Sequence, residues 1–432
     1  MRILLITDEI WNDRVFGNNV LQNWFEGMPD VEIAQICATP GRPYNNVCTR
    51  YFQITDSMML QSLCGKRAGN SFSVSVEEMR DNPQTRNYIV ESKFYSFMKR
   101  ISSTPVKLAR EALWNLGRFD RKALFEFIVD FNPDVVFCPR LLTWKLMRIE
   151  KAVAKLTNAP FVAFTGDDEA SFKEHSYDPL FWLNRWAFHK AFARHSRLYS
   201  HYFMHSADQA KEYNEEYGLE TSTLFKCGNF AEEYIPKKVG TPIRMVYAGR
   251  LYCNRWKSLA EIGKVLKEIN MEEERMVLDI YTQDILTDNQ RLALSPENHI
   301  FIKGSVNQQQ LREVYRNADI ALHVESLDKK FRLVTRISFS TKIIDLMASS
   351  CAIIALCWEQ HTGYKYLKEK DAAFCVSDYN DLLPVLRGIC DHPESIGEYA
   401  QKAYECGQTN HSRTKIQRQL LETFTKRQIN DI

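Results

Sequence analysis

The stretch 243–269, IRMVYAGRLYCNRWKSLAEIGKVLKEI, decides the fold class. Its residues 244–248 form a short apolar strand that ends at Gly249. Apolar residues then recur at positions 259, 262, 265, 266 and 269, which is the spacing of an amphipathic helix. A strand, a glycine-containing loop and a helix in this order predict an α/β unit.

The same alternation extends to both sides of this stretch. In the second half of the chain, strands are expected at 276–281, 300–303, 320–324 and 352–356. In the first half, strands are expected at 3–6, 31–36, 135–138, 161–164 and 198–204, with a long helical insertion at 57–131. Strands that are joined through helices pair in parallel by right-handed crossovers.

A segment rich in Pro and Gly, 229–242, breaks both periodicities and indicates a domain boundary. The sequence therefore predicts an α/β protein with two tandem Rossmann-like domains that face each other across a cleft. The N-terminal domain spans 1–235 and the C-terminal domain spans 243–410. In open parallel sheets, ligands bind at the carboxyl ends of the strands.

Composition excludes several classes of protein. The 432 residues include 56 Lys and Arg against 54 Asp and Glu, a net charge of +2, which argues against general nucleic-acid binding. The 11 cysteines form no Cys-x-x-Cys pair, so we expect free thiols in a reducing cytoplasm. No apolar segment approaches the roughly 18 residues of a membrane span. We therefore expect a cytoplasmic protein.

Three cations, Arg250, Arg255 and Lys257, follow the strand at 244–248. Gly249 ends that strand, where the missing side chain lets a ligand approach the backbone. Cations at the carboxyl end of a strand suit a diphosphate. The alternative interpretation is a solvated basic loop.

A second candidate site is the start of the helix expected at 341–348. Ser340 or Thr341 is a suitable N-cap, so free N–H groups and the positive end of the helix dipole would face the cleft. Lys342 adds charge in the first turn, and Asp345 lies on the same face as Thr341. Asp345 could accept hydrogen bonds from ribose hydroxyls, or it could be an exposed carboxylate of an ordinary capped helix.

Two further candidates lie in the first half. The strand at 161–164 runs into three carboxylates that begin at Asp167, which could bind acceptor hydroxyls, act as a base or form a solvated turn. They do not form a convergent ligand set, and we predict no metal. Gly17 lies in a loop that lacks the complete Gly-x-Gly-x-x-Gly pattern of dinucleotide binding.

The stretch 86–122 carries nine cations and three anions with interleaved aromatic residues. Such a pattern suits the surface of an anionic membrane. The aromatic side chains could equally belong to the core.

Taken together, these residues resemble the donor-binding domain of GT-B glycosyltransferases, most closely glycosyltransferase family 4. The resemblance rests on 246–251 with Lys257, the turn at 303–306, the segment 311–324 and the helix start at 340–343. The opening sequence TDEIWNDRVFGNNVLQNWF, 7–25, is similar to enzymes of bacterial capsule or surface polysaccharide clusters. In this fold the last helix, here 411–432, crosses back to the N-terminal domain.

The resemblance implies transfer of a sugar from a nucleotide-sugar donor to a saccharide or lipid-linked acceptor, usually with retention and without a metal or other cofactor. By position, Arg250 and Lys257 would hold the donor diphosphate and Val306 would contact the base. Asp345 would bind the ribose in place of the second Glu of the family's Glu-x7-Glu motif, and Gly17 would approach the donor phosphate.

The sequence departs from the family pattern at two places. Ile337 stands where the first Glu of that motif is expected, and Glu325 is the nearest substitute. The family's His after the strand at 161–164 is absent, and Gly166 and Asp167 occupy that stretch. The predicted catalytic residues are Arg250, Lys257, Asp167 and Glu325. The predicted donor-binding residues are Gly17, Gly249, Arg255, Val306, Thr341, Lys342 and Asp345.

Two alternatives stay open. One is a nucleotide-sugar epimerase of the same architecture, which would convert the donor without an acceptor. The other is a non-catalytic nucleotide-binding subunit of an assembly complex. A peripheral position at the inner membrane face, through 86–122, is a separate hypothesis.

Overall fold

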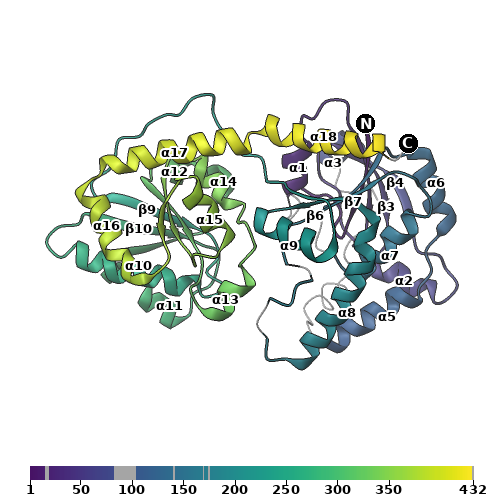
Figure 1. Ribbon diagram of the computed structural model, residues 1–432, viewed down its shortest axis with the longest axis horizontal. Coiled ribbons are helices and arrows are strands. Elements are labelled where there is room, and N and C mark those ends of the chain that lie inside the picture. Colours follow the sequence, from purple (N-terminus) through teal and green to yellow (C-terminus); the bar gives the residue numbers. More distant parts are fainter. Residues whose placement is uncertain (15–18, 82–103, 140–141, 169, 174–175, 431–432) are drawn as a thin grey trace. The chain divides into compact units, whose positions relative to one another are not determined.

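The structure is a computed structural model that describes residues 1–14, 19–81, 104–139, 142–168, 170–173 and 176–430 (Figure 1). The chain divides into two compact units. The first unit consists of Met1–Ala170, Leu183–Leu224 and Ile416–Ile432, and the second consists of Ser171–Trp182 and Phe225–Lys415. The Pro- and Gly-rich segment 229–242 thus lies inside the second unit, and the chain passes between the units after Ala170, Trp182, Leu224 and Lys415.

The first unit is built on an eight-stranded sheet with the order β4-β3-β2-β1-β5-β6-β7-β8. All neighbouring strands are parallel except β3 and β4. The strands are β1 (Arg2–Thr7), β2 (Glu32–Cys37), β3 (Cys48–Gln53), β4 (Asn70–Ser73), β5 (Val135–Pro139), β6 (Phe161–Thr165), β7 (Tyr199–Met204) and β8 (Thr221–Thr223). The central strands read as continuous apolar runs because both faces of a parallel sheet are buried.

Helices cover both faces of this sheet. Their bounds are α1 (Asn19–Phe25), α2 (Asp56–Ser62), α3 (Val76–Asp81), α5 (Thr104–Leu116), α6 (Arg121–Phe131), α7 (Trp144–Val153), α8 (Pro179–His195), α9 (Ala207–Tyr217) and α18 (Arg413–Asn430). The insertion expected to be helical at 57–131 contains β4 as well as α2, α3, α5 and α6, so a purely helical insertion is wrong. The four residues of β4 are too few and too polar to show a strand pattern.

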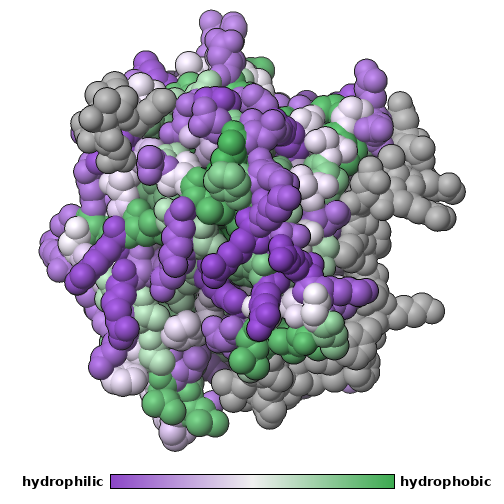
Figure 2. Space-filling view, turned by 90° about the vertical axis from the view of Figure 1, so that its right-hand side faces the viewer, coloured by the Kyte–Doolittle hydropathy of each residue, from purple (hydrophilic) through white to green (hydrophobic). Residues whose placement is uncertain are grey.

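Part of the basic stretch 86–122 packs into this unit. Trp114 is buried in the core, Phe119 packs against it, and Arg110 pairs with Asp56 (2.8 Å). The core alternative therefore applies to these two aromatic residues, while 86–103 lie outside the described residues. Figure 2 shows the side of the molecule that carries α2 and α6, where hydrophobic side chains form small areas among hydrophilic ones.

The second unit is a six-stranded parallel sheet with the order β11-β10-β9-β12-β13-β14. Its strands are β9 (Ile243–Ala248), β10 (Met276–Tyr281), β11 (Ile300–Gly304), β12 (Ile320–Val324), β13 (Ala352–Leu356) and β14 (Phe374–Val376). Its helices are α10 (Arg255–Ile269), α11 (Asp288–Ala293), α12 (Gln308–Arg316), α13 (Lys329–Val334), α14 (Lys342–Met347), α15 (Thr362–Glu369), α16 (Leu382–Asp391) and α17 (Glu394–His411). Because β9 lies beside both β10 and β12, the strand order reverses at this position.

Alternate residues of each strand supply two cores. Met245 and Tyr247 of β9 face the apolar sides of α10 and α16, whereas Val246 faces the side of α12, α14 and α17. This alternation is the period-2 geometry of a strand. The described helices include none that is long and apolar enough to cross a membrane.

The last helix, α18, completes the core of the first unit (Figure 1). Ile416, Leu420 and Phe424 recur every four residues and are buried. The Phe424 ring meets the Phe137 ring edge-on at 5.2 Å, and Gln417 donates a hydrogen bond to the Trp24 carbonyl oxygen (2.8 Å). The C-terminal helix is therefore a structural part of the first unit.

Phe424→Ala should destabilise the first unit by about 3 to 5 kcal/mol, because it removes a fully buried ring and leaves a cavity. Urea denaturation followed by circular dichroism measures the loss in free energy of unfolding. Phe125→Ala, which truncates a half-exposed ring of α6, is the matched control and should cost much less. Equal losses in the two variants would contradict the structural role of α18.

Candidate active site

The loop after β9 is held in place by its own backbone contacts. The Gly249 N–H donates to the Tyr281 carbonyl oxygen (2.9 Å), and the Leu251 N–H donates to the Asp284 carboxylate (2.6 Å). The Tyr247 hydroxyl donates to the Arg250 carbonyl oxygen (2.6 Å). These bonds fix the carboxyl end of β9, where the sequence predicts the donor diphosphate.

Lys342 lies directly over Gly249. Its ammonium donates to the Ala248 carbonyl oxygen (3.2 Å), and a Cβ atom at position 249 would come within 2.1 Å of the Lys342 Nζ. Gly249 is therefore required for this approach of the ammonium. Removal of the ammonium from water and the nearby charge of Arg255 lower the pKa of Lys342, although Glu325 opposes this shift.

Arg255 and Glu325 form a bidentate ion pair at the same edge. The Arg255 Nε and Nη2 donate to the two Glu325 carboxylate oxygens at 2.9 and 2.7 Å. Their side chains are only 11% and 6% exposed. Although burial alone would lower it, the Glu325 charge keeps the pKa of Arg255 raised. Each charge of the pair is thus compensated by the other.

Arg250 and Lys257 have partners that a ligand could replace. With the Gln283 amide turned so that its oxygen faces the guanidinium, Arg250 donates to it at 3.1 and 3.0 Å. The Lys257 ammonium lies 3.3 Å from an Asp328 carboxylate oxygen, and both side chains of this pair are about half exposed. An exposed pair of this kind is worth little and exchanges easily.

The start of α14 differs from the expectation. Thr341 occupies the N-cap position with a helical backbone, and its side chain makes no capping hydrogen bond. The helix begins at Lys342 and spans six residues. The predicted N-cap by a hydroxyl of Ser340 or Thr341 is wrong for Thr341, because Thr341 itself continues the helical backbone. The Lys342 charge, rather than a long helix dipole, supplies the positive potential here.

Asp345 is paired with a residue that the sequence did not single out. The Lys226 ammonium donates to both Asp345 carboxylate oxygens, at 2.7 and 2.9 Å. The two residues are 119 positions apart, so no local pattern could have indicated this pair. Lys226 therefore joins the candidate site.

Val306 lies between β11 and α12 and is half-buried. Asn307 and Gln310 form a capping box at the start of α12, which fixes the position of the turn. The predicted base-contacting turn thus belongs to the same unit as Gly249 and Lys342.

Asp167 belongs to the first unit, after β6. Removal of its carboxyl group from water, and then the charge of Asp168, raise its pKa. The imidazole of His205, at the end of the neighbouring strand β7, fills the space beside Gly166: a Cβ atom there would come within 2.5 Å of the His205 Nδ1. Burial lowers the pKa of His205 to about 4, so the ring is neutral near pH 7. Gly17 lies outside the described residues.

One group of possible metal ligands comes together within the described residues. His323, Cys357 and His361 are buried, with ligand atoms within 4.8 Å of one another. Burial lowers the pKa of His361, and its Nδ1 accepts a hydrogen bond from the Gly363 N–H (3.1 Å). A neutral ring with an acceptor Nδ1 carries its proton on Nε2, so neither nitrogen offers a free lone pair. As it stands, this group lacks a complete ligand set.

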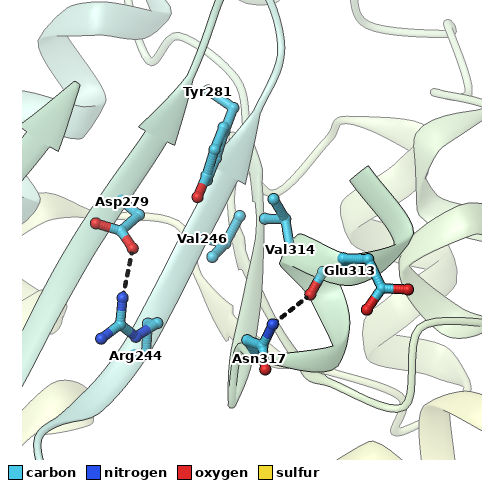
Figure 3. A pocket seen from close by; sticks show the side chains of 7 residues that line it. All are labelled: Arg244, Val246, Asp279, Tyr281, Glu313, Val314 and Asn317. Carbon is cyan, nitrogen blue, oxygen red and sulfur yellow. Dashed lines mark hydrogen bonds and ion pairs between the residues drawn. The ribbon is translucent and has the colours of Figure 1, made fainter. Parts of the chain in front are cut away.

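A hollow of about 580 Å³ lies along the sheet of the second unit, on the side of α12 (Figure 3). Figure 3 shows Arg244 paired with Asp279 on the two strands and Tyr281 beyond them. The other lining residues are Val246, Glu313, Val314 and Asn317. None of the predicted site residues lines this hollow, so the candidate site is defined by the cluster around Gly249 instead.

The fold that carries this site is known from other proteins. Sucrose-phosphate synthase from Thermosynechococcus elongatus has a TM-score of 0.57 at 12% identity, over 98% of this chain and 98% of that chain. HepE from Anabaena, in complex with UDP, has a TM-score of 0.58 at 10% identity, over 99% and 100%. A chain of the GtfA/B complex gives 0.52 at 13% identity, over 72% of this chain and only 61% of that one.

The chain therefore has the GT-B fold of glycosyltransferases, and the predicted fold class is confirmed. Residues 249–422, less than half of the chain, match the sequence family described as glycosyl transferase-like. This segment includes Gly249, Glu325, Lys342 and Asp345. The resemblance to GT-B glycosyltransferases is confirmed, and the narrower assignment to family 4 stays a prediction. No curated protein matches the sequence.

Glu325→Ala should destabilise the second unit by about 3 to 5 kcal/mol, because it leaves the buried Arg255 charge without its partner. Urea denaturation followed by fluorescence measures this loss. Glu313→Ala, on the exposed surface of α12, is the control and should change the free energy of unfolding little.

The double variant Arg255→Met/Glu325→Leu should recover most of that stability, since neither buried charge remains. If Glu325→Ala were as stable as the wild type, the pair would not fix the edge of the sheet.

Proposed function

We propose that this protein transfers a sugar from a nucleotide-sugar donor to a saccharide or lipid-linked acceptor. The observation that carries the proposal is the Lys342 ammonium held over Gly249, the residue before Arg250, at the carboxyl end of β9. The match of 249–422 to a glycosyl transferase-like family supports it. HepE in complex with UDP and a trehalose-phosphate synthase from Burkholderia xenovorans in complex with glucose-6-phosphate share this fold, which supports a UDP-sugar donor and a sugar-type acceptor.

The chemistry needs positive charge at the leaving group. Cleavage of the bond between the sugar and the diphosphate develops negative charge on the diphosphate and oxocarbenium character on the sugar. Lys342, Arg250 and Lys257 would stabilise this leaving group electrostatically. Arg255 acts differently: because Glu325 neutralises it, it positions the loop and does not serve as a phosphate ligand.

Asp345 would bind the two ribose hydroxyls. In the structure its carboxylate accepts two hydrogen bonds from Lys226, which a ribose diol could replace. The released Lys226 ammonium would then lie beside the bound nucleotide, where a cation is favourable. This exchange keeps the carboxylate paired before and after donor binding.

The finer parts of the proposal rest on the sequence. Retention of anomeric configuration, membership of family 4 and a role in capsule or surface polysaccharide synthesis come from the resemblance. The cytoplasmic location comes from the free cysteines, and peripheral contact to the inner membrane face comes from the cations of the stretch 86–122. No metal or other cofactor is part of this mechanism. Asp167, with its raised pKa, is the proposed acceptor-binding or basic residue of the first unit.

A non-catalytic nucleotide-binding subunit is the second candidate function. The observation that favours it is the closed Arg255–Glu325 pair. Glu325 is the nearest substitute for the missing first Glu of the Glu-x7-Glu motif, and its carboxylate is already paired with Arg255. Product analysis with a panel of nucleotide sugars separates the functions. An enzyme releases nucleoside diphosphate and glycosylates an acceptor, an epimerase converts the donor without an acceptor, and a binding subunit does neither.

Lys342→Gln and Arg250→Ala should each lower kcat/KM for the donor by about 10² to 10³, because each removes a charge that faces the leaving diphosphate. Lys257→Gln should have a smaller effect of the same sign, since Asp328 already compensates this ammonium. Lys264→Gln, on the same helix but paired with Glu261, is the matched control and should keep the wild-type rate. Wild-type rates in both Lys342→Gln and Arg250→Ala would overturn the site.

The affinity for UDP should depend on pH through Lys342. The protonated ammonium binds the diphosphate, so affinity is highest below the pKa of Lys342 and falls as the pH rises through it. Because this pKa is lowered, the fall begins at a lower pH than for an ordinary lysine. In Lys342→Arg the guanidinium stays charged, and this fall should disappear. Isothermal titration calorimetry over a pH series measures both curves, and identical curves would contradict the assignment.

A further inference from the structure

Helix α8 carries apolar residues on two opposite faces. At about 100° per residue, Phe188 and Phe192 lie on one side, and both are buried in the core of the first unit. Leu183 and Trp186 lie on the opposite side, where they are 61% and 49% exposed. Large apolar side chains that gather on an exposed face mark a surface that contacts a partner or a membrane. The outer face of α8 is therefore a candidate contact surface.

The outer face also has a defined charge. Lys190 and Arg194 continue the same stripe, one and two turns after Trp186, and the Lys190 ammonium lies 3.9 Å from the centre of the Trp186 ring. The whole helix, Pro179–His195, contains no Asp or Glu. On its inner side, His189 faces Glu216 of α9 (3.7 Å). The exposed stripe is thus apolar in its first half and cationic in its second half.

This pattern selects one kind of partner. An amphipathic helix at a lipid surface inserts Leu and Trp at the acyl boundary and places Lys and Arg among anionic headgroups. A second copy of the chain fits less well, because a stable protein interface needs about 20 to 30 residues on each side. Such an interface would also bring the same cations together. A lipid surface requires neither so large a set of contact residues nor the approach of like charges.

We propose that the outer face of α8 within the first unit, formed by Leu183, Trp186, Lys190 and Arg194, docks on an anionic lipid surface. This deepens the membrane part of the proposed function and moves it from the stretch 86–122 to α8. Sugar transfer is not needed for docking, so a failure of one proposal is distinguishable from a failure of the other.

The test is flotation of the full chain with vesicles of phosphatidylglycerol and phosphatidylcholine, compared with vesicles of phosphatidylcholine alone. We expect the wild type to float with the anionic vesicles at low salt and to dissociate as salt is added. Leu183→Glu/Trp186→Glu should lower the partition coefficient at least tenfold. Lys190→Gln/Arg194→Gln should lower it about fivefold for each charge removed.

Leu292→Glu, at a 73% exposed position of α11 in the second unit, is the matched control and should float as the wild type does. All these side chains are exposed, so the variants should unfold at the wild-type Tm, and circular dichroism checks this. The proposal is overturned if the wild type does not float at low salt or if Leu183→Glu/Trp186→Glu floats unchanged. It is also overturned if light scattering shows a dimer that this variant converts to monomer.

Discussion

The buried ion pair between Arg255 and Glu325 holds together the edge of the second unit that carries the candidate site. Arg255 opens α10, and Glu325 directly follows β12, so the pair joins two elements at the position where the strand order reverses. Neither charge can stay buried alone, because an unpaired buried ion costs several kcal/mol. The pair therefore fixes the start of α10, which follows the loop that carries Gly249. The Lys342 ammonium donates a hydrogen bond to the Ala248 carbonyl oxygen at this loop.

The same pair changes the roles of its members. Considered by type alone, Arg255 is a phosphate ligand and Glu325 is a catalytic carboxylate. In the structure each satisfies the other, whereas Arg250 and Lys257 have exchangeable partners and Lys342 lies over Gly249. Residue type and position in the chain thus indicate where a candidate site lies, whereas the pairing of charges indicates which of its side chains remain available to a ligand.

Local patterns in the sequence predict elements and residue types, but they do not predict contacts between distant residues. Central strands such as β9 and β12 are buried on both faces and show as apolar runs, so the fold class was predictable. Edge strands such as β4 are short and polar and were missed. Gly249 and Lys342 were predicted from local motifs, but their contact was not. The Lys226–Asp345 pair joins residues 119 positions apart, and no pattern in a single sequence reports such a distance.

The position of α18 has a consequence for synthesis of the chain. The Phe137 ring is covered by Phe424, which the ribosome adds almost 300 residues later. The face of the sheet that α18 covers at β5 therefore stays exposed while the whole second unit is synthesised. Domains usually fold as units during translation, but here the earlier unit is the last to be finished. An apolar surface that stays open this long is a natural target for chaperones that bind nascent chains.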